Sequence, residues 1–111
     1  MLRHPREISA VQRSGTGKTH PLLLGRFLAN GLGRTRIALS TGRRLGGAVV
    51  RNRVRRRLRE GLRALAPGFD PGWDILIVAR PESATAGSRE LRAALGELLR
   101  RGGVLGERSG S

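Results

Sequence analysis

Arginine is concentrated in the middle of the chain at a density that suits the binding of phosphate groups. Six of the nine residues from Arg51 to Arg59 carry a guanidinium group, namely Arg51, Arg53, Arg55, Arg56, Arg57 and Arg59. A guanidinium group is a planar fork that pairs two phosphate oxygens at once and also stacks on bases. The segment therefore predicts a surface that binds the phosphates of a nucleic acid.

An apolar thread runs through these arginines at helical spacing. Its members fall within an arc of about 120° on a helix, namely Val50, Val54, Leu58, Leu62 and Leu65. A solvated charged face is the usual explanation of a charge run, but such a face carries mixed signs, and Glu60 relieves little of the repulsion here. We therefore expect a folded helix with one buried stripe and a phosphate-binding remainder.

The residues around the start of this helix add to the basic surface. Arg43 and Arg44 precede it, and Gly46–Gly47 would let the backbone approach an anion at the helix N-terminus. A plain glycine turn explains the two glycines equally well. Asn52, the one neutral polar residue within the run, either bonds a base or ribose or faces water.

Residues for catalysis by the protein itself are not apparent. The chain has no cysteine, and His4 and His20 lack partners at metal-ligand spacing. Gly15–Thr19 resembles part of a phosphate-binding loop, but Gln12 stands where that motif requires a glycine. The eight acidic residues include no pair spaced like a catalytic dyad. These observations favour binding over chemistry.

Composition points to the same class of protein. The 111 residues suit a single domain, and 22 basic against 8 acidic residues give a net charge of +14. Such an excess repels itself, so a polyanionic partner is its natural explanation, whereas the preference for arginine over lysine also fits a genome rich in G and C. Without a signal peptide or an apolar run of spanning length, we expect a cytoplasmic protein with no membrane partner.

Periodicity predicts an α/β arrangement within one RNA-binding domain over residues 1–111. The unbroken apolar run Ile75–Ala79 suits a central strand, and the order strand, helix, strand suggests a crossover. The expected elements are a helix over 5–13, a polar connection over 14–19, strands over 22–29 and 36–40, a helix that ends before Pro67–Gly68, a turn over 70–72, a strand over 75–79, a helix over 88–101 and a flexible tail over 102–111.

The central segment closely resembles the bacterial ribonuclease P protein subunit. Arg51-Asn52-Arg53, preceded by Gly-Gly-Ala-Val-Val, is that family's signature, and the likeness spans the chain from Leu22 onward, through Asp74–Pro81 to the helix Leu91–Arg101. The resemblance implies a small two-layer α/β (α+β) sandwich with a mixed sheet. It also implies a left-handed strand-helix-strand crossover, although nearly all such crossovers are right-handed.

The resemblance implies a protein subunit whose partner RNA carries the catalysis. In this family the catalytic RNA of ribonuclease P, with Mg²⁺ bound mainly by RNA, removes the 5′ leader of precursor tRNA, and the protein helps to bind that leader. No small-molecule cofactor is expected. The residues expected to contact RNA by this likeness and by their charge are Arg43, Arg44, Arg51, Asn52, Arg53, Arg55, Arg56, Arg57 and Arg59.

The chain departs from the family where the leader would bind. Two phenylalanines of the family's first helix match Ile8 and Gln12, and an aromatic or histidine of the first long strand matches Gly25. Single-strand RNA binders commonly stack bases on aromatic rings. Phe27, two residues along on the same face of that strand, or Arg26 would take over that contact in the leader cleft. Trp73 is expected to pack in the core.

Two other functions are compatible with part of the sequence. A structural RNA-binding protein, such as a ribosomal protein, would share the composition. Only the residues around Arg51-Asn52-Arg53 distinguish the ribonuclease P subunit from such a protein. A self-sufficient nuclease would need an acidic or metal-binding constellation that the sequence lacks.

Overall fold

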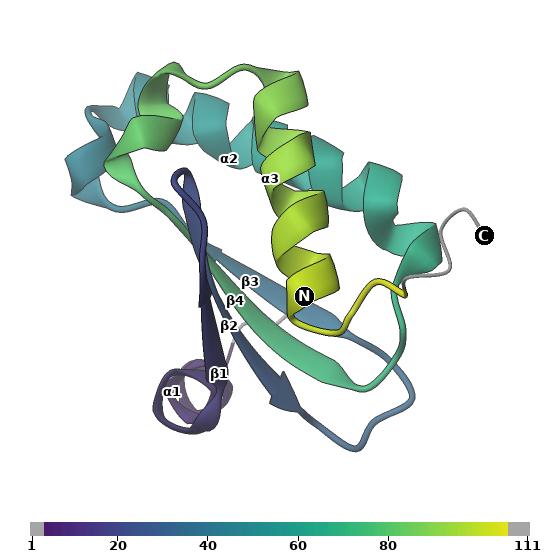
Figure 1. Cartoon of the computed structure of the whole chain (residues 1–111). Coiled ribbons are helices and arrows are strands. Elements are labelled where there is room, and N and C mark those ends of the chain that lie inside the picture. Colours follow the sequence, from purple (N-terminus) through teal and green to yellow (C-terminus); the bar gives the residue numbers. More distant parts are fainter. Residues whose placement is uncertain (1–3, 107–111) are drawn as a thin grey trace.

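The fold is built around a four-stranded sheet with helices on both of its faces (Figure 1). The computed structural model describes residues 4–106. Its strands are β1 (Thr16–Thr19), β2 (Leu23–Ala29), β3 (Arg36–Ser40) and β4 (Trp73–Ala79). Its helices are α1 (Pro5–Ser14), α2 (Ala48–Leu65) and α3 (Ser88–Arg101), with short 3₁₀ turns at Arg43–Leu45, Ala66–Gly68 and Pro81–Thr85. The expected α/β fold class is confirmed.

Strand β4 lies inside the sheet, as its apolar run predicts. The strand order is β1-β2-β4-β3, with antiparallel pairs β1/β2 and β2/β4 and a parallel pair β3/β4. The register places Leu23 opposite Ala79 and Arg36 opposite Asp74. Because β3 and β4 are parallel, α2 must cross over the sheet to connect them.

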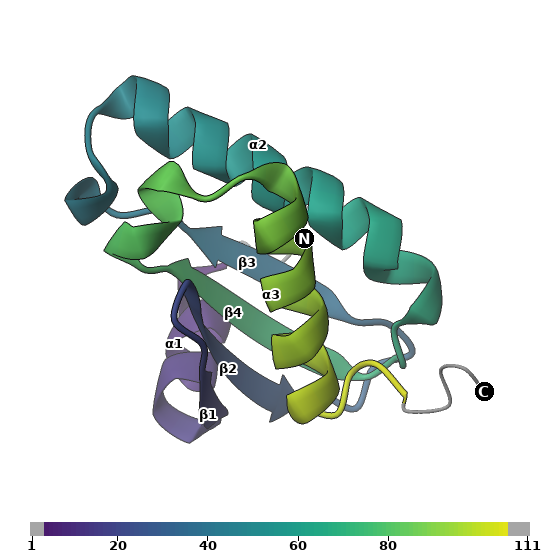
Figure 2. The ribbon, with the colours of Figure 1, turned by 45° about the horizontal axis from the view of Figure 1, so that its top comes forward.

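The crossover β3-α2-β4 has the unusual hand. Figure 2 views the sheet from the side that α2 and α3 cover, and there β3 and β4 run toward the upper left. Along that direction β4 lies to the left of β3, so the connection is left-handed. Periodicity alone would have favoured the right-handed form, and the expectation taken from the family resemblance is the correct one.

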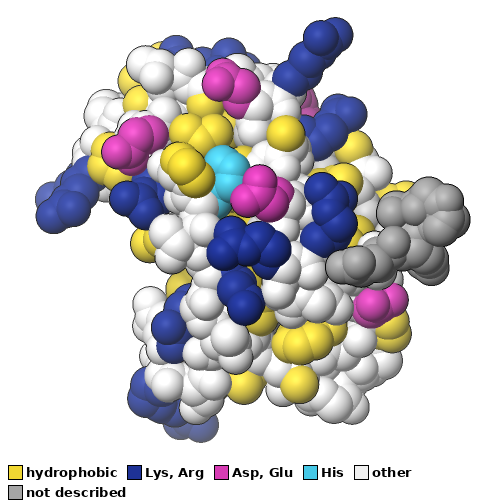
Figure 3. All heavy atoms as spheres, in the orientation of Figure 1, with side chains coloured by type: hydrophobic (Ala, Val, Ile, Leu, Met, Phe, Trp, Pro, Cys, Tyr) yellow, Lys and Arg dark blue, Asp and Glu magenta, His cyan; other side chains and the backbone are white. Residues whose placement is uncertain are grey.

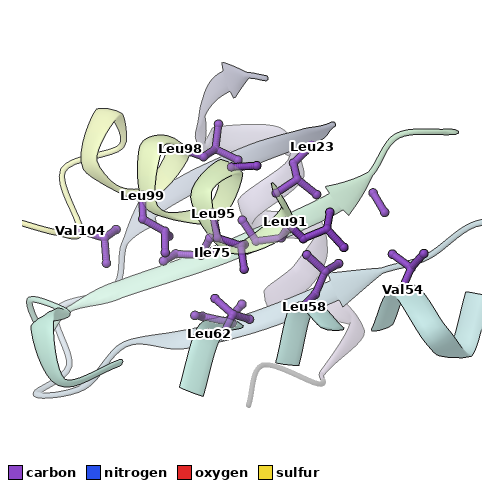
Figure 4. Packing of buried hydrophobic residues seen from close by; sticks show 14 of the residues in the cluster. Leu23, Val54, Leu58, Leu62, Ile75, Leu91, Leu95, Leu98, Leu99 and Val104 are labelled. Atoms are coloured by element: carbon purple, nitrogen blue, oxygen red, sulfur yellow. The ribbon is translucent and has the colours of Figure 1, made fainter. Parts of the chain in front are cut away.

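The core divides between the two faces of the sheet by the alternation of β4. Ile75 and Ile77 pack with α2 and α3, and Figure 4 shows this cluster with Leu58, Leu95 and their neighbours. Leu76 packs on the opposite face with Val11 of α1. Burying both faces of one strand explains why its sequence is continuously apolar.

Helices α2 and α3 approach closely because a glycine stands at their contact. A Cβ atom added to Gly61 would lie 3.6 Å from Cα of Arg92 and 2.9 Å from Cδ1 of Leu95, so a larger residue would displace the Leu95 side chain. The apolar thread of α2 is buried at Val54, Leu58 and Leu62, and its ends, Val50 and Leu65, are partly buried against the same core. Burial of this apolar stripe holds the arginine-rich helix against α3 and the sheet.

Two segments of the described chain differ from the secondary structure expected for them. The segment expected as a connection over 14–19 contains β1, which pairs with β2 in a hairpin. The segment expected as a flexible tail over 102–111 is packed as far as it is described, since Val104 is fully buried and Leu105 forms a β-bridge with Phe69. Residues 107–111 lie outside the described residues.

An ion-pair network at the start of β3 and β4 joins these two strands to α1 and to the turn after β2. The guanidinium of Arg36 donates to both carboxylate oxygens of Asp74, at 2.8 and 2.7 Å, and to Oε2 of Glu7 in α1 at 2.7 Å. Asn30, which follows β2, donates to Asp74 Oδ1 at 2.8 Å. Burial by itself raises the pKa of Asp74, but the hydrogen bonds from Arg36 and Asn30 outweigh it and lower that pKa below its ordinary value.

The C-terminal packing can be tested with one substitution. We expect Val104→Ala to lower the free energy of unfolding by about 2 kcal/mol, because two buried methyl groups are lost and a cavity remains. Urea unfolding measures the difference. The matched control is Val49→Ala, at a position 78% exposed, where we expect a change below about 0.5 kcal/mol. Equal effects at the two positions would contradict the packing of Val104.

The Arg36–Asp74 pair predicts a specific acid sensitivity. The pKa of Asp74 is lower in the folded state, so the pair stabilises the fold above the ordinary aspartate pKa of about 3.9, and that contribution is lost as the pH falls below it. Urea unfolding between about pH 6 and pH 3 should therefore show a steeper loss for the natural chain than for Asp74→Asn. If the unfolding free energies of the two proteins fell in parallel with pH, the Arg36–Asp74 pair would not be the source of the acid sensitivity.

Candidate nucleic-acid interface

Helix α2 presents its arginines on two different sides. The exposed positions form a stripe along the side turned away from the core, which we call the outer arginine face: Asn52, Arg56, Arg59 and Arg63. Arg51, Arg53, Arg55 and Arg57 are only partly exposed. The division follows from helical geometry, because the buried stripe of Val54, Leu58 and Leu62 sets which residues flank the core.

The outer arginine face is hollowed and almost free of negative charge. A depression of about 380 Å³ is lined by Asn52, Arg55, Arg56, Arg59, Glu60 and Arg63. Its lining contains a single carboxylate among four guanidinium groups. Exposed guanidinium groups at helical spacing can pair successive phosphates of a polyanion, and the Asn52 amide adds a donor and an acceptor for a base or ribose.

Two of the flanking arginines bind the protein itself. Arg53 donates to the carbonyl oxygen of Ala84 at 3.0 Å, and Arg57 donates to that of Ala86 at 2.7 Å. Both acceptors lie in the connection between β4 and α3, so these side chains fasten that connection to α2. Each guanidinium group has five N–H donors, so donors remain for an external phosphate.

A second basic group lies at the carboxyl ends of the parallel strands β3 and β4. Arg43 and Arg44 sit in the 3₁₀ turn before α2, and Arg80 follows β4. The three line a depression of about 360 Å³ whose other residues are Leu24, Ser40, Gly42, Val78, Ala79 and Pro81. Gly46 ends the turn at φ +131°, a backbone conformation that favours glycine.

A groove on the α1 face joins residues that the sequence separates widely, and we call it the α1 groove. It measures about 380 Å³ and is lined by Ile8, Gln12, Ala38, Leu39, Ser40, Thr41, Arg55, Leu76 and Val78. Ser40 and Val78 also line the depression beside Arg43 and Arg44, so the two hollows adjoin. Arg55, which donates a hydrogen bond to Thr41, connects the groove to α2.

Strand β2 separates the expected leader-cleft residues onto opposite faces. Arg26 faces α1, where its guanidinium donates to the carbonyl oxygen of Gln12 at 2.7 Å. Phe27 faces the other way and is 2% exposed in the core. The expectation that Phe27 stacks a base is therefore wrong, because consecutive strand residues point to opposite faces and Phe27 is on the α3 side.

The position matched to the family's strand aromatic also faces the core. A Cβ atom added to Gly25 would lie 2.9 Å from Cε1 of Phe27 and 3.0 Å from Cδ2 of Leu98 in α3. Any side chain there would enter the helical layer rather than the α1 groove. Ile8 and Gln12, in contrast, do line the groove.

Other motifs singled out in the sequence have structural roles. Within residues 4–106, no three His, Cys, Asp or Glu side chains gather in a way that could hold a metal ion. His4 caps α1 by accepting from the Arg6 amide, and His20 accepts from the Leu22 amide. Gly15–Thr19 enters the β1-β2 hairpin and does not form a phosphate-binding loop. In the same described part, no helix is long and apolar enough to cross a membrane.

Charge is distributed unequally over the molecule. On the face around α3, acidic side chains lie among the basic ones (Figure 3). Pairs there include Arg101 with Glu97 at 3.6 Å and Arg80 with Glu82 at 3.8 Å. The outer arginine face has only Glu60 to offset its charge. The excess of positive charge is therefore concentrated on α2 and the turn before it.

This fold and surface define a class of protein: a small α/β domain that presents an arginine-rich crossover helix to a polyanion. The chain matches the ribonuclease P family model over residues 1–103. The ribonuclease P protein component of Roseiflexus sp. strain RS-1 is 41% identical over 105 residues, which cover 94% of this chain and 86% of that relative. The chain belongs to the ribonuclease P protein family.

Solved structures agree with this assignment. RNase P protein from Thermotoga maritima, solved with 1-(4-fluorophenyl)-2-thiourea, gives a TM-score of 0.84 at 26% identity, covering 91% of this chain and 98% of that one. RNase P protein from Staphylococcus aureus gives 0.86 at 19% identity, covering 95% and 96%. The second match shows the shared fold. The family is part of the endoribonuclease that processes tRNA, so this chain is a component of an RNA-containing holoenzyme.

The two sides of α2 predict different costs of losing an arginine. We expect Arg57→Ala to lower the free energy of unfolding by about 1 kcal/mol, because the carbonyl of Ala86 loses its donor. Arg56→Ala, one residue away and exposed, should change it by less than about 0.5 kcal/mol. Thermal or urea unfolding of the free protein measures both. A larger loss for Arg56→Ala would contradict this division.

Proposed function

We propose that this chain binds the catalytic RNA of ribonuclease P and the 5′ leader of precursor tRNA, and thereby supports removal of the leader. The observation that carries the proposal is the outer arginine face on a helix whose sequence matches the family signature. The protein contributes binding and positioning, and the RNA performs the cleavage. The setting of this activity is the cytoplasm.

The RNA contacts are assigned by exposure. Arg56 and Arg59 lie on the outer arginine face and take phosphates of the catalytic RNA, and Asn52 on the same face bonds a base or ribose. Arg51, Arg53, Arg55 and Arg57 flank it and contribute their remaining donors. Arg43 and Arg44 extend the basic surface beyond the start of α2.

The precursor-tRNA leader is placed in the α1 groove. Its lining offers the apolar surface of Ile8, the Gln12 side chain and the Arg55 guanidinium. Arg26 supports this groove by bonding the Gln12 carbonyl oxygen and offers its remaining donors to a phosphate. Phe27 does not contact the leader because it lies in the core. No aromatic residue lines the groove, so polar and apolar contacts replace ring stacking there.

Magnesium enters this proposal as a cofactor of the holoenzyme. The polar side chains of α2 are arginines and Asn52 with a single carboxylate, Glu60, whereas Mg²⁺ prefers several oxygen ligands such as carboxylates. This donor set does not suit a magnesium site of the protein's own on that helix. We assign the ions mainly to the RNA, and the arginines reduce the repulsion between RNA phosphates.

Leader cleavage at low magnesium tests the proposed function. Bacterial ribonuclease P RNA alone, this protein alone and the two together are incubated with a precursor tRNA. We expect efficient cleavage only in the mixture. Cleavage by the protein alone would show that it carries a catalytic site, and RNA binding without stimulation would favour a purely structural RNA-binding protein.

The salt dependence of RNA binding tests the residue assignment. The double variant Arg56→Gln/Arg59→Gln should bind ribonuclease P RNA more weakly and make the negative slope of log K against log salt shallower by about 1.5, because two phosphate contacts are lost. The control, Arg89→Gln/Arg100→Gln, removes the same charge from exposed positions on α3. An equal change of slope in both variants would refute the assignment to α2.

A further inference from the structure

The three aromatic residues of this chain occupy very different surroundings. Phe27 is buried in the core, and Trp73 is half-buried against it. Phe69 is also partly buried against the core, but in addition it lines an open hollow of about 560 Å³, which we call the aromatic hollow. Its volume falls in the range of small-ligand sites, roughly 300–1,000 Å³.

The aromatic hollow lies between the C-terminal end of α2 and the edge strand β3. Its apolar lining comes from Ile37, Leu62, Ala66 and Phe69, with Thr35 beside them. Its remaining lining residues are Arg59 and Arg63, which also belong to the outer arginine face. The hollow is therefore continuous with the basic surface of α2.

Phe69 is held in position by the segments on either side of it. Its backbone amide donates to the carbonyl oxygen of Ala66 at 3.0 Å, and its backbone forms a β-bridge with Leu105. The next residue, Asp70, donates to the carbonyl oxygen of Val104 at 2.7 Å and accepts from the hydroxyl of Thr35 at 2.7 Å. The hollow is thus formed without a ligand, which lowers the entropic cost of binding.

We propose that the aromatic hollow accepts one unstacked base of bound RNA, with the flanking phosphates paired by Arg59 and Arg63. The proposal rests on the proposed function for the identity of the partner as RNA. An apolar, partly aromatic floor beside guanidinium groups matches the two parts of a nucleotide, a flat base and a charged phosphate.

Charge decides between RNA and a protein segment as the occupant. No carboxylate lines the hollow, and both charged residues in its lining are arginines. An RNA strand that follows the outer arginine face reaches the hollow through the same two arginines. Continuity with that face therefore favours a nucleotide.

The hollow can be filled without changing charge or the core. Ala66 is exposed and lines the hollow, so Ala66→Gln narrows it with a neutral side chain. Ala64 is also exposed but is not part of the lining, so Ala64→Gln is the matched control. Phe69→Leu is a second variant, which keeps an apolar side chain and removes the ring. Thermal unfolding confirms that each variant is folded.

The probe is octaadenylate compared with an abasic oligomer of the same length and charge, measured by fluorescence anisotropy. Stacking of one base is worth about 1 kcal/mol or more, so the natural protein should prefer octaadenylate by about fivefold or more. Ala66→Gln and Phe69→Leu should lower this preference several-fold and leave abasic binding unchanged. Ala64→Gln should preserve it. A preference unaffected by Ala66→Gln and Phe69→Leu would overturn the proposal.

Methyl NMR with small probes locates the contact. Adenosine 5′-monophosphate should shift the signals of Ile37 and Leu62 in the natural protein and not in Ala66→Gln. Shifts caused by an octaglutamate peptide but not by the nucleotide would assign the hollow to an acidic protein segment and overturn the proposal. Neither assay contains ribonuclease P RNA. A negative result for base binding in the hollow is therefore distinct from a negative result for the proposed function.

Discussion

Burial of the apolar stripe of α2 is the interaction on which the rest of this structure depends. The helix carries a dense set of like charges that repel each other at i and i+4 spacing. Val54, Leu58 and Leu62 offset that repulsion by packing against α3 and the sheet, and Gly61 lets α3 approach closely. The same packing directs the arginines outward, so folding and the proposed binding surface share one cause.

The arginines of α2 divide their work between folding and binding. Arg53 and Arg57 satisfy backbone carbonyls of the connection that leads into α3, whereas Arg56, Arg59 and Arg63 are exposed. A uniform basic run in the sequence thus becomes a surface with two functions. Substitutions within it should not be compared without separating their effects on stability from their effects on RNA binding.

Helices α2 and α3 are predictable because their apolar residues recur at helical spacing, and the three longer strands are predictable because they are short apolar segments bounded by turn residues. Strand β1 was missed because Thr16–Thr19 is polar and gains its conformation from pairing with β2. The packed segment around Val104 was missed because two apolar residues in a glycine-rich stretch show no period. Both depend on tertiary contacts.

The candidate site was predictable in its residue types and less so in its geometry. The residue types and the apolar spacing predict that α2 is a basic helix. They do not show which of its arginines donate to the protein's own carbonyl oxygens. The packing of the sheet sets which face of β2 lies toward α1, and the sequence does not show this packing. The sequence therefore places Phe27 and Gly25 toward the leader cleft, whereas both face the helical layer. The aromatic hollow needs Phe69 and Ile37 together, and they lie far apart in the sequence.

The most direct test of the account is protection of a single thiol by RNA. The chain has no cysteine, so an introduced one is unique. Glu60→Cys places it beside the outer arginine face, and Ala93→Cys places it at an exposed position on α3. We predict that ribonuclease P RNA slows alkylation of the thiol at position 60 and leaves that at position 93 reactive. Protection at 93 without protection at 60 would contradict the account.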